Sequence, residues 1–229
     1  MVIIILAGGF GKRLQFISQG IPKALLPIGN KVFLDKIFGN IFKLNIDHIY
    51  LSLYYKPELF EAYLRSSSYS NRIKPIIEPK PLGTGGAIKY VVESTSISSP
   101  FFAINGDTLS NLNLGKMKIA FDESGYDIMV GVSYINNASR YGTVKFEGDR
   151  LIDFIEKGSA LSGWINNGHY IMNKDVLNDI SVGEFSIEFD VFPKLTSDGR
   201  IGVFPVIDDD FIDIGIPEDY QRLLKRNKQ

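Results

Sequence analysis

The chain opens with an apolar run that leads directly into glycines and basic residues, in the stretch ILAGGFGKRL at residues 5–14. Residues 2–6 are continuously apolar and rich in β-branched side chains. Such a run is typical of a strand that is buried on both faces within a parallel sheet. The feature therefore favours an α/β fold, with the glycine-rich segment placed where the first strand ends.

Strand-like and helical patterns alternate through the first half of the chain. Further strands are expected at HIYLSLYY, RIKPIIE and FFAINGD, and helices at residues 33–44, from Pro57, and at GAIKYVVES. This alternation predicts a Rossmann-like, doubly wound and mostly parallel sheet. In open sheets of this kind, ligands bind in the crevice at the carboxyl ends of the strands.

The pattern changes after about Asp127. Four strand-like runs follow with little helix between them, at DIMVGVSYI, GTVKF, LIDFIEK and WINNGHYIM, and helices are expected near residues 187–195 and from Pro217. We expect this half to be smaller, more antiparallel and folded over the first half. No segment has the composition of a flexible linker, so residues 1–229 are interpreted as one domain.

Composition excludes several kinds of site and partner. The net charge is −1, which argues against a nucleic-acid partner, and the chain has no cysteine and only two histidines. Disulfides, thiolate metal sites, a cysteine nucleophile and an all-histidine zinc site are therefore excluded. No secretory signal or membrane span is apparent, so we expect a cytoplasmic protein without a membrane partner. Whether it forms a homo-oligomer is left open.

The early loop has the composition of an anion-binding site. It contains three glycines and two basic residues: Gly8, Gly9, Gly11, Lys12 and Arg13. Glycines let the backbone turn tightly and present its N–H groups, and an arginine binds two phosphate oxygens at once. The dinucleotide-binding pattern fails because its third glycine is a leucine, and the Walker pattern fails because Arg13 replaces its Ser or Thr. The sequence therefore indicates a phosphate loop of another type.

A second motif identifies that type. GGFGKRL is followed by QFISQG and then by IPKALLPI at residues 21–28, where Pro22 precedes Lys23. The combination resembles the sugar 1-phosphate nucleotidyltransferases, whose pattern is close to G-G-x-G-x-R-L, a spacer, and P-K-x-L-x-P-I. The resemblance extends over nearly the whole chain, through PLGTGGAI (81–88), INGDTL (104–109), FIEKG (154–158), INNGHYIM (165–172) and FIDIGIPEDY (211–220).

This resemblance implies a GT-A-like nucleotidyltransferase fold, with residues 1–126 mainly binding nucleotide and residues 127–229 mainly binding sugar phosphate. Members transfer a nucleoside monophosphate from a nucleoside triphosphate to a sugar 1-phosphate. The pattern is most similar to the D-glycero-D-manno-heptose 1-phosphate guanylyltransferases, which implies GTP and a heptose 1-phosphate as substrates. Mannose 1-phosphate guanylyltransferases, other small members and a catalytically silent nucleotide-binding subunit stay as alternatives.

The resemblance also assigns roles to residues. It makes Arg13 and Lys23 catalytic. It assigns nucleotide binding to Leu6, Ala7, Gly8, Gly9, Gly11, Lys12, Glu78, Leu82, Gly83, Thr84 and Gly85. It assigns sugar phosphate binding to Tyr141, Gly142, Glu156, Lys157, Asn167 and Gly168.

Two aspartates are expected to bind a metal ion. Asp107 and Asp213 each follow a predicted strand, and Mg²⁺ prefers oxygen ligands that it shares with substrate phosphates. The resemblance implies that this pair binds Mg²⁺. Asp208, Asp209 and Asp210 also match the D-x-D pattern of metal-dependent glycosyltransferases, but we interpret them as a solvated turn. His169 has no acid–base partner in the sequence and is interpreted as structural.

Overall fold

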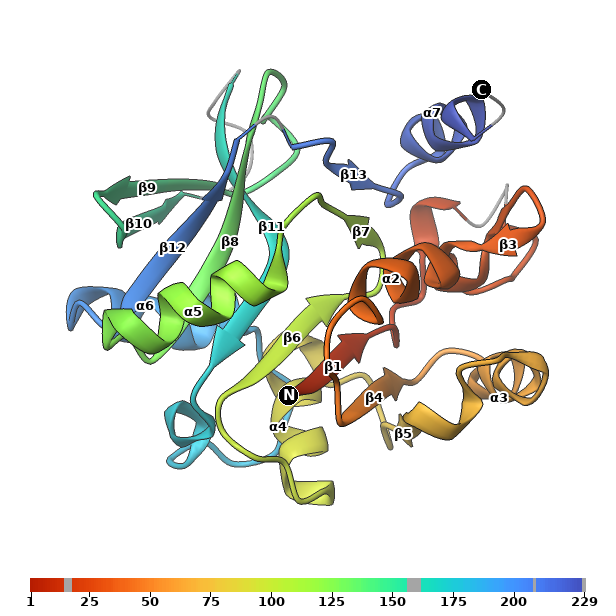
Figure 1. The fold of residues 1–229 in the computed structure, drawn as a ribbon, viewed down its shortest axis with the longest axis horizontal. Coiled ribbons are helices and arrows are strands. Elements are labelled where there is room, and N and C mark those ends of the chain that lie inside the picture. The colour runs from red at the N-terminus through yellow and green to blue at the C-terminus, as the bar shows by residue number, and fades with distance from the viewer. Residues whose placement is uncertain (15–17, 156–161, 208, 228–229) are drawn as a thin grey trace.

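The computed structural model describes residues 1–14, 18–155, 162–207 and 209–227. Its centre is a nine-stranded sheet with the order β5-β4-β1-β6-β11-β8-β12-β10-β9 (Figure 1). Four parallel strands come from the first half: β1 (Val2–Leu6), β4 (His48–Leu53), β5 (Ile73–Ile77) and β6 (Phe101–Asn105). Each coincides with an expected run, so the parallel, Rossmann-like part of the predicted fold is confirmed.

The second half of the chain extends the same sheet. Its strands are β8 (Ile128–Ile135), β9 (Thr143–Glu147), β10 (Arg150–Ile155), β11 (Gly163–Met172) and β12 (Ile201–Val206). The expectation that this half folds over the first is wrong, because β11 pairs edge to edge with β6, antiparallel, with His169 opposite Ile104. This half is more antiparallel, as expected, but strand β12, which the sequence patterns do not predict, runs parallel to β8.

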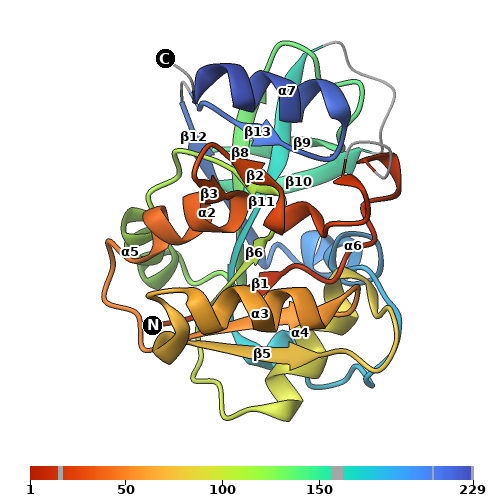
Figure 2. The same ribbon diagram turned by 90° about the vertical axis from the view of Figure 1, so that its right-hand side faces the viewer.

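Helices cover both faces of the sheet (Figure 2). One face carries α2 (Phe33–Ile41), α3 (Pro57–Ser66), α5 (Leu114–Ser124) and α7 (Pro217–Arg226). The other carries α4 (Gly83–Ser94), a π-turn η5 (Ile187–Val191) and α6 (Phe192–Ser197). Ile3 and Ile5 face the first layer while Val2 and Ile4 face the second, since alternate residues of a strand point to opposite faces. This arrangement explains why the first strand is apolar throughout.

Short elements surround the carboxyl ends of the parallel strands. Two-stranded ladders join β7 (Thr108–Leu109) to β13 (Ile212–Asp213) and β2 (Pro27–Ile28) to β3 (Lys31–Val32). The single helical turns η1 (Lys12–Leu14) and η2 (Lys23–Leu25) also lie here, whereas η3 (Ser70–Arg72) precedes β5 and η4 (Lys174–Leu177) follows β11. None of the helices in the described ranges is long and apolar enough to cross a membrane.

Candidate active site

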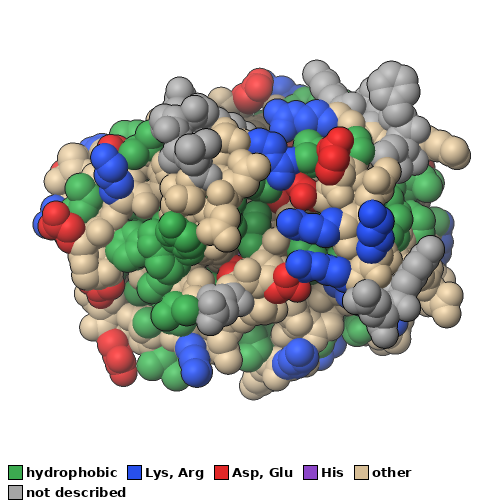
Figure 3. All heavy atoms as spheres, turned by 90° about the horizontal axis from the view of Figure 1, so that it is seen from above, with side chains coloured by type: hydrophobic (Ala, Val, Ile, Leu, Met, Phe, Trp, Pro, Cys, Tyr) green, Lys and Arg blue, Asp and Glu red, His purple; other side chains and the backbone are tan. Residues whose placement is uncertain are grey.

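Two cavities meet at the carboxyl ends of β1 and β6. The glycine-loop cavity, of about 320 Å³, lies between the glycines after β1 and the start of α4; the β11 cavity, of about 400 Å³, lies between the start of α4, β7 and β11. Both are lined by Thr84, Asn105 and Asp107. Lysines and arginines gather beside acidic side chains on part of the face seen in Figure 3. The site therefore has two compartments with a shared wall.

Lys23 is placed by its own motif and by the glycine loop that precedes it. Pro22 precedes the helical turn η2, which starts at Lys23. Gly11 has a φ of +60°, and a Cβ at this position would lie 2.8 Å from Cγ of Lys23. The glycine loop thus packs against the stem of Lys23, and the ammonium group forms an ion pair with the carboxylate of Asp107.

The two predicted metal ligands lie side by side. Asp107 directly precedes β7 and Asp213 ends β13, and the Ile214 N–H donates to the Asp107 carbonyl oxygen at 3.0 Å. Burial and the charge of Asp107 raise the pKa of Asp213, and the charge of Lys23 acts in the opposite direction. Mutual repulsion in a buried place is what a bound cation would relieve.

The metal site is incomplete by itself. Among the residues that the structure describes, no group of three or more His, Cys, Asp or Glu side chains is arranged to hold an ion. Two carboxylates fit a cation that takes its other oxygen ligands from substrate and water, as Mg²⁺ does.

Glu78 forms the buried end of the glycine-loop cavity. Its carboxylate accepts hydrogen bonds from the Ser52 hydroxyl at 2.8 Å and from the Leu82 N–H at 3.3 Å. Burial raises the pKa of Glu78. Gly8 packs beside it, because a Cβ there would lie 2.9 Å from the Glu78 carboxylate. A fixed carboxylate at this depth is suited to accept N–H groups of a ligand.

The glycines of the PLGTGGAI motif have two different roles. Leu82, Gly83 and Thr84 line the glycine-loop cavity. The N–H groups of Gly85 and Gly86 instead donate to the Phe185 carbonyl oxygen at 3.1 and 3.2 Å. Gly85 therefore packs the start of α4 against Phe185, and its assigned contact with the nucleotide stays a prediction.

A residue without an assigned role organises the β11 cavity. Glu188 accepts hydrogen bonds from Thr84 (2.7 Å), Ser186 (2.6 Å) and Tyr170 (2.7 Å). Asn166 Nδ2 in turn donates to the Tyr170 hydroxyl at 2.7 Å. The network connects the start of α4 with β11. A glutamate at the start of an apolar helical run was the signal in the sequence, but only the fold brings it to Thr84.

The structure places the neighbouring residues Asn166 and Asn167 on opposite faces of β11. Asn166 lines the β11 cavity, together with the predicted Tyr141 and Gly142. Asn167, which was assigned to the sugar, is fully buried on the other face, where it donates to the Ser133 hydroxyl at 3.0 Å. Asn167 therefore does not line this cavity, because the direction of each side chain alternates along a strand.

The residues that follow Asn167 shape the strand. Gly168 has a φ of +80° and lies against Asn105, where a Cβ would come within 2.6 Å of Nδ2. His169 is buried with Nδ1 3.2 Å from the Asn167 carbonyl oxygen, and burial lowers the pKa of His169 to about 4. Its position agrees with the structural interpretation.

The remaining assigned residues lie partly at or near the glycine-loop cavity and partly outside the described residues. Arg13 is exposed, Leu6, Gly8 and Gly9 line the glycine-loop cavity, and Ala7 is buried in the α2 layer. Glu156, Lys157 and the side chain of Lys12 lie outside the described residues.

The acidic trio is more than a solvated turn. Asp209 accepts hydrogen bonds from the Ser110 hydroxyl and the Asn111 N–H, both at 2.6 Å, and from the Ser133 hydroxyl. Asp210 pairs with Arg226 at the surface, and Asp208 lies outside the described residues. The earlier interpretation is therefore wrong for Asp209, because tertiary folding brings three donors to this one carboxylate.

The chain is similar to known proteins over nearly its whole length. The chain is 40% identical to D-glycero-alpha-D-manno-heptose 1-phosphate guanylyltransferase of Campylobacter jejuni over 99% of this chain and 100% of that protein. A protein of the same name from Aneurinibacillus thermoaerophilus is also 40% identical, over 98% and 97% of the two chains. The crystal structure of HddC from Yersinia pseudotuberculosis complexed with GMP-PN superposes with a TM-score of 0.84 and 34% identity, covering 98% of both chains. The family model described as nucleotidyl transferase matches residues 2–228, and the chain belongs to this family.

Proposed function

We propose that this chain transfers GMP from GTP to D-glycero-α-D-manno-heptose 1-phosphate, giving GDP-heptose and pyrophosphate. The observation that carries the proposal is the position of Asp107, which lines both cavities, forms an ion pair with Lys23 and lies beside Asp213. The two curated relatives at 40% identity, which match over nearly their full length, support the choice of GTP and the heptose phosphate.

In this proposal the glycine-loop cavity takes the nucleotide. Guanine presents two adjacent N–H donors, N1–H and the exocyclic amino group, to which a carboxylate is the matching acceptor. Glu78 is buried at the end of this cavity, held by Ser52 and Leu82. Uracil and thymine offer one ring N–H flanked by carbonyl oxygens, which a carboxylate repels. Glu78 therefore supports a preference for guanine.

The proposed reaction is an in-line displacement at phosphorus. An oxygen of the sugar 1-phosphate forms a bond to the α-phosphorus of GTP, and the bond from that phosphorus to the α,β-bridging oxygen breaks. Pyrophosphate leaves with the bonding electrons. The attacking phosphate oxygen is already anionic, so the step needs positioning and charge stabilisation rather than a general base.

Cationic side chains provide that stabilisation. Lys23 is ion-paired with Asp107, which lines both cavities, and only 19% of the Lys23 side chain is exposed. In such an environment a charge acts more strongly on the reacting phosphate than it would in water. Arg13 extends from the glycine loop and is assigned to the triphosphate tail.

Asp107 and Asp213 are proposed to hold Mg²⁺. The fit rests on the adjacent positions of the two carboxylates at the β7–β13 ladder and on the raised pKa of Asp213, which burial and the charge of Asp107 cause. When bound, the ion would neutralise negative charge on the phosphate oxygens. Asp107 is shared between this role and the ion pair that fixes the ammonium group of Lys23.

The β11 cavity is proposed to take the sugar phosphate. Asn166, Glu188 and Tyr141 line it with polar groups, and Phe154 and Phe211 supply apolar surface. Several hydroxyl groups of one sugar need both donors and acceptors, and this wall offers an amide, a carboxylate and a phenol. We place Asn166 here instead of Asn167.

The proposal is tested by pyrophosphate release with Mg²⁺. GTP, UTP, CTP, ATP and dTTP are each paired with heptose, mannose and glucose 1-phosphates. The highest kcat/KM is expected for GTP with the heptose phosphate. A maximum with mannose 1-phosphate or another nucleotide would replace the substrate and retain the mechanism. No release with any pair from folded, nucleotide-binding protein would refute the proposed activity.

A further inference from the structure

The strand that carries Asp213 has little structure of its own. Strands β13 and β7 pair through two residues each, Ile212 with Leu109 and Asp213 with Thr108. Isolated two-stranded ladders are marginal in water even when they are longer. The position of Asp213 beside Asp107 therefore depends on what anchors the segment at its two ends.

The anchor after Asp213 is helix α7. Tyr220 packs into the core beneath α2, and its hydroxyl donates to the Pro27 carbonyl oxygen at 2.6 Å. Asp219 adds an ion pair with Arg140 at 2.6 Å. These contacts hold the chain downstream of Asp213 but leave the approach from β12 to be fixed separately.

The anchor before Asp213 is the carboxylate of Asp209. One carboxylate oxygen accepts from the Asn111 N–H, and the other accepts from the hydroxyls of Ser110 and Ser133. Ser110 and Asn111 directly follow β7, which carries the other half of the ladder. Asp209 thus ties the segment that enters β13 to the segment that leaves β7, at the end of the ladder next to Ile212 and Leu109.

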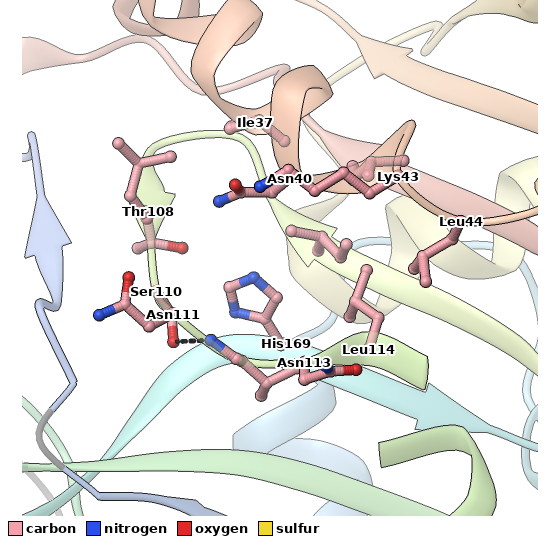
Figure 4. Close-up of a pocket in the computed structure, with 14 residues that line it drawn as sticks. Ile37, Asn40, Lys43, Leu44, Thr108, Ser110, Asn111, Asn113, Leu114 and His169 are labelled. Atoms are coloured by element: carbon pink, nitrogen blue, oxygen red, sulfur yellow. Dashed lines mark hydrogen bonds between the residues drawn. The ribbon is translucent and has the colours of Figure 1, made fainter. Parts of the chain in front are cut away.

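The same carboxylate is tied to the main sheet. Ser133 is buried on β8 and accepts a hydrogen bond from Asn167 of β11. Gly131 makes room for this contact, since a Cβ there would lie 2.6 Å from Oδ1 of Asn167. Ser110 lines a cavity of about 260 Å³ beneath α2, into which His169 points (Figure 4). The network therefore connects Asp209 to rigid strands rather than to a surface loop.

We propose that Asp209 is a positioning residue that holds Asp213 against Asp107 and thereby completes the metal-binding pair. The metal role of that pair rests on the proposed function, but the positioning itself does not. In the acidic trio the middle residue, Asp209, is the anchor. Asp210 forms an exposed ion pair with Arg226 and does not anchor the segment.

The test compares Asp209→Ala with Asp210→Ala, which removes the same charge from the neighbouring position. The first measurement is hydrogen exchange of the Ile214 amide, which donates to the Asp107 carbonyl oxygen, with the amides of β1 as the reference for global opening. Asp209→Ala is expected to speed exchange at Ile214 about tenfold relative to β1, and Asp210→Ala is expected to leave it unchanged. This measurement does not require turnover.

The second measurement is the affinity for Mn²⁺ alone, followed by electron paramagnetic resonance. Loss of a residue that orients metal ligands typically weakens metal binding about 10- to 100-fold, and we expect this for Asp209→Ala. Asp209→Asn keeps the shape of the side chain and the acceptor for Asn111, so its Mn²⁺ affinity should lie between those of the parent and Asp209→Ala. This variant is used if the alanine variant does not fold. Unchanged protection of Ile214, or unchanged Mn²⁺ affinity in the folded variant, would overturn the inference. Absence of pyrophosphate release from the parent would refute the proposed activity alone.

Discussion

Replacement of Lys23 by alanine tests the centre of the proposed site. The ammonium group is paired with Asp107, which lines both cavities, and only 19% of the Lys23 side chain is exposed. At an effective dielectric constant of about 20, a charge pair about 4 Å apart interacts by about 4 kcal/mol. Removal of one preorganised group that stabilises transition-state charge typically lowers kcat about 10²- to 10³-fold. We therefore expect a loss of this size in Lys23→Ala.

The assay is pyrophosphate release at saturating GTP, heptose 1-phosphate and Mg²⁺. Lys31→Ala is the matched control, because Lys31 is an exposed lysine on β3, eight residues further along. The control should keep kcat within about twofold of the parent, as surface substitutions are usually close to neutral. Circular dichroism and thermal unfolding should show that both variants fold. A folded Lys23→Ala protein with parental kcat would refute the reasoning.

Four further substitutions follow from the geometry. Glu78→Gln should raise the KM for GTP about 10- to 100-fold, since hydrogen bonds to charged groups contribute about 1.5–3 kcal/mol; equal effects on all nucleotides would contradict the assignment of Glu78 to the base. Glu188→Gln should mainly raise the KM for the sugar phosphate, measured at saturating GTP, and an effect confined to GTP would contradict its place in the β11 cavity. Asp213→Asn should abolish turnover yet stabilise the fold at neutral pH, as measured by urea unfolding. The raised pKa of Asp213 means that the folded protein binds the proton more tightly, so its ionisation costs stability as the pH rises from 3.8 through the raised pKa; a loss of stability at pH 7 would contradict this. His169→Gln should reduce the acid sensitivity of the fold. The pKa of His169 is lowered from 6.5 to about 4, so about 3 kcal/mol of the free energy of unfolding is lost as the pH falls across that interval. An equal loss of unfolding free energy in parent and variant between pH 7 and pH 4 would exclude this role of His169.

The strands of the first half were predictable because each has a recognisable local pattern of apolar residues. A run such as VIIIL is apolar at every position, and this happens when helices cover both faces of a strand, as they do for β1. The site motifs were predictable for a similar reason. Gly11 and Lys23 are close in sequence, so their packing depends on few intervening residues.

The elements that the sequence did not predict lack a clear local pattern. Strand β12, IGVFPV, contains a glycine and a proline, which weaken a strand pattern. Helix α5 has only three buried residues in eleven, so its apolar stripe is weak. The choice between Asn166 and Asn167 depended on which face of β11 borders the cavity, and no local pattern reveals that.

The sequence by itself determined the α/β class, the family and the set of groups available for chemistry, because strand periodicity and motif spacing are local properties of the chain. Only the tertiary structure decided which groups act together. Asp213 meets Asp107 across a sequence separation of about a hundred residues, and Asp209 meets Ser110 across a similar one. Glu188 likewise meets Thr84 only because η5 packs against the start of α4. Contacts of this kind depend on how strands from both halves order themselves in one sheet, and that order is set by the packing of the whole core.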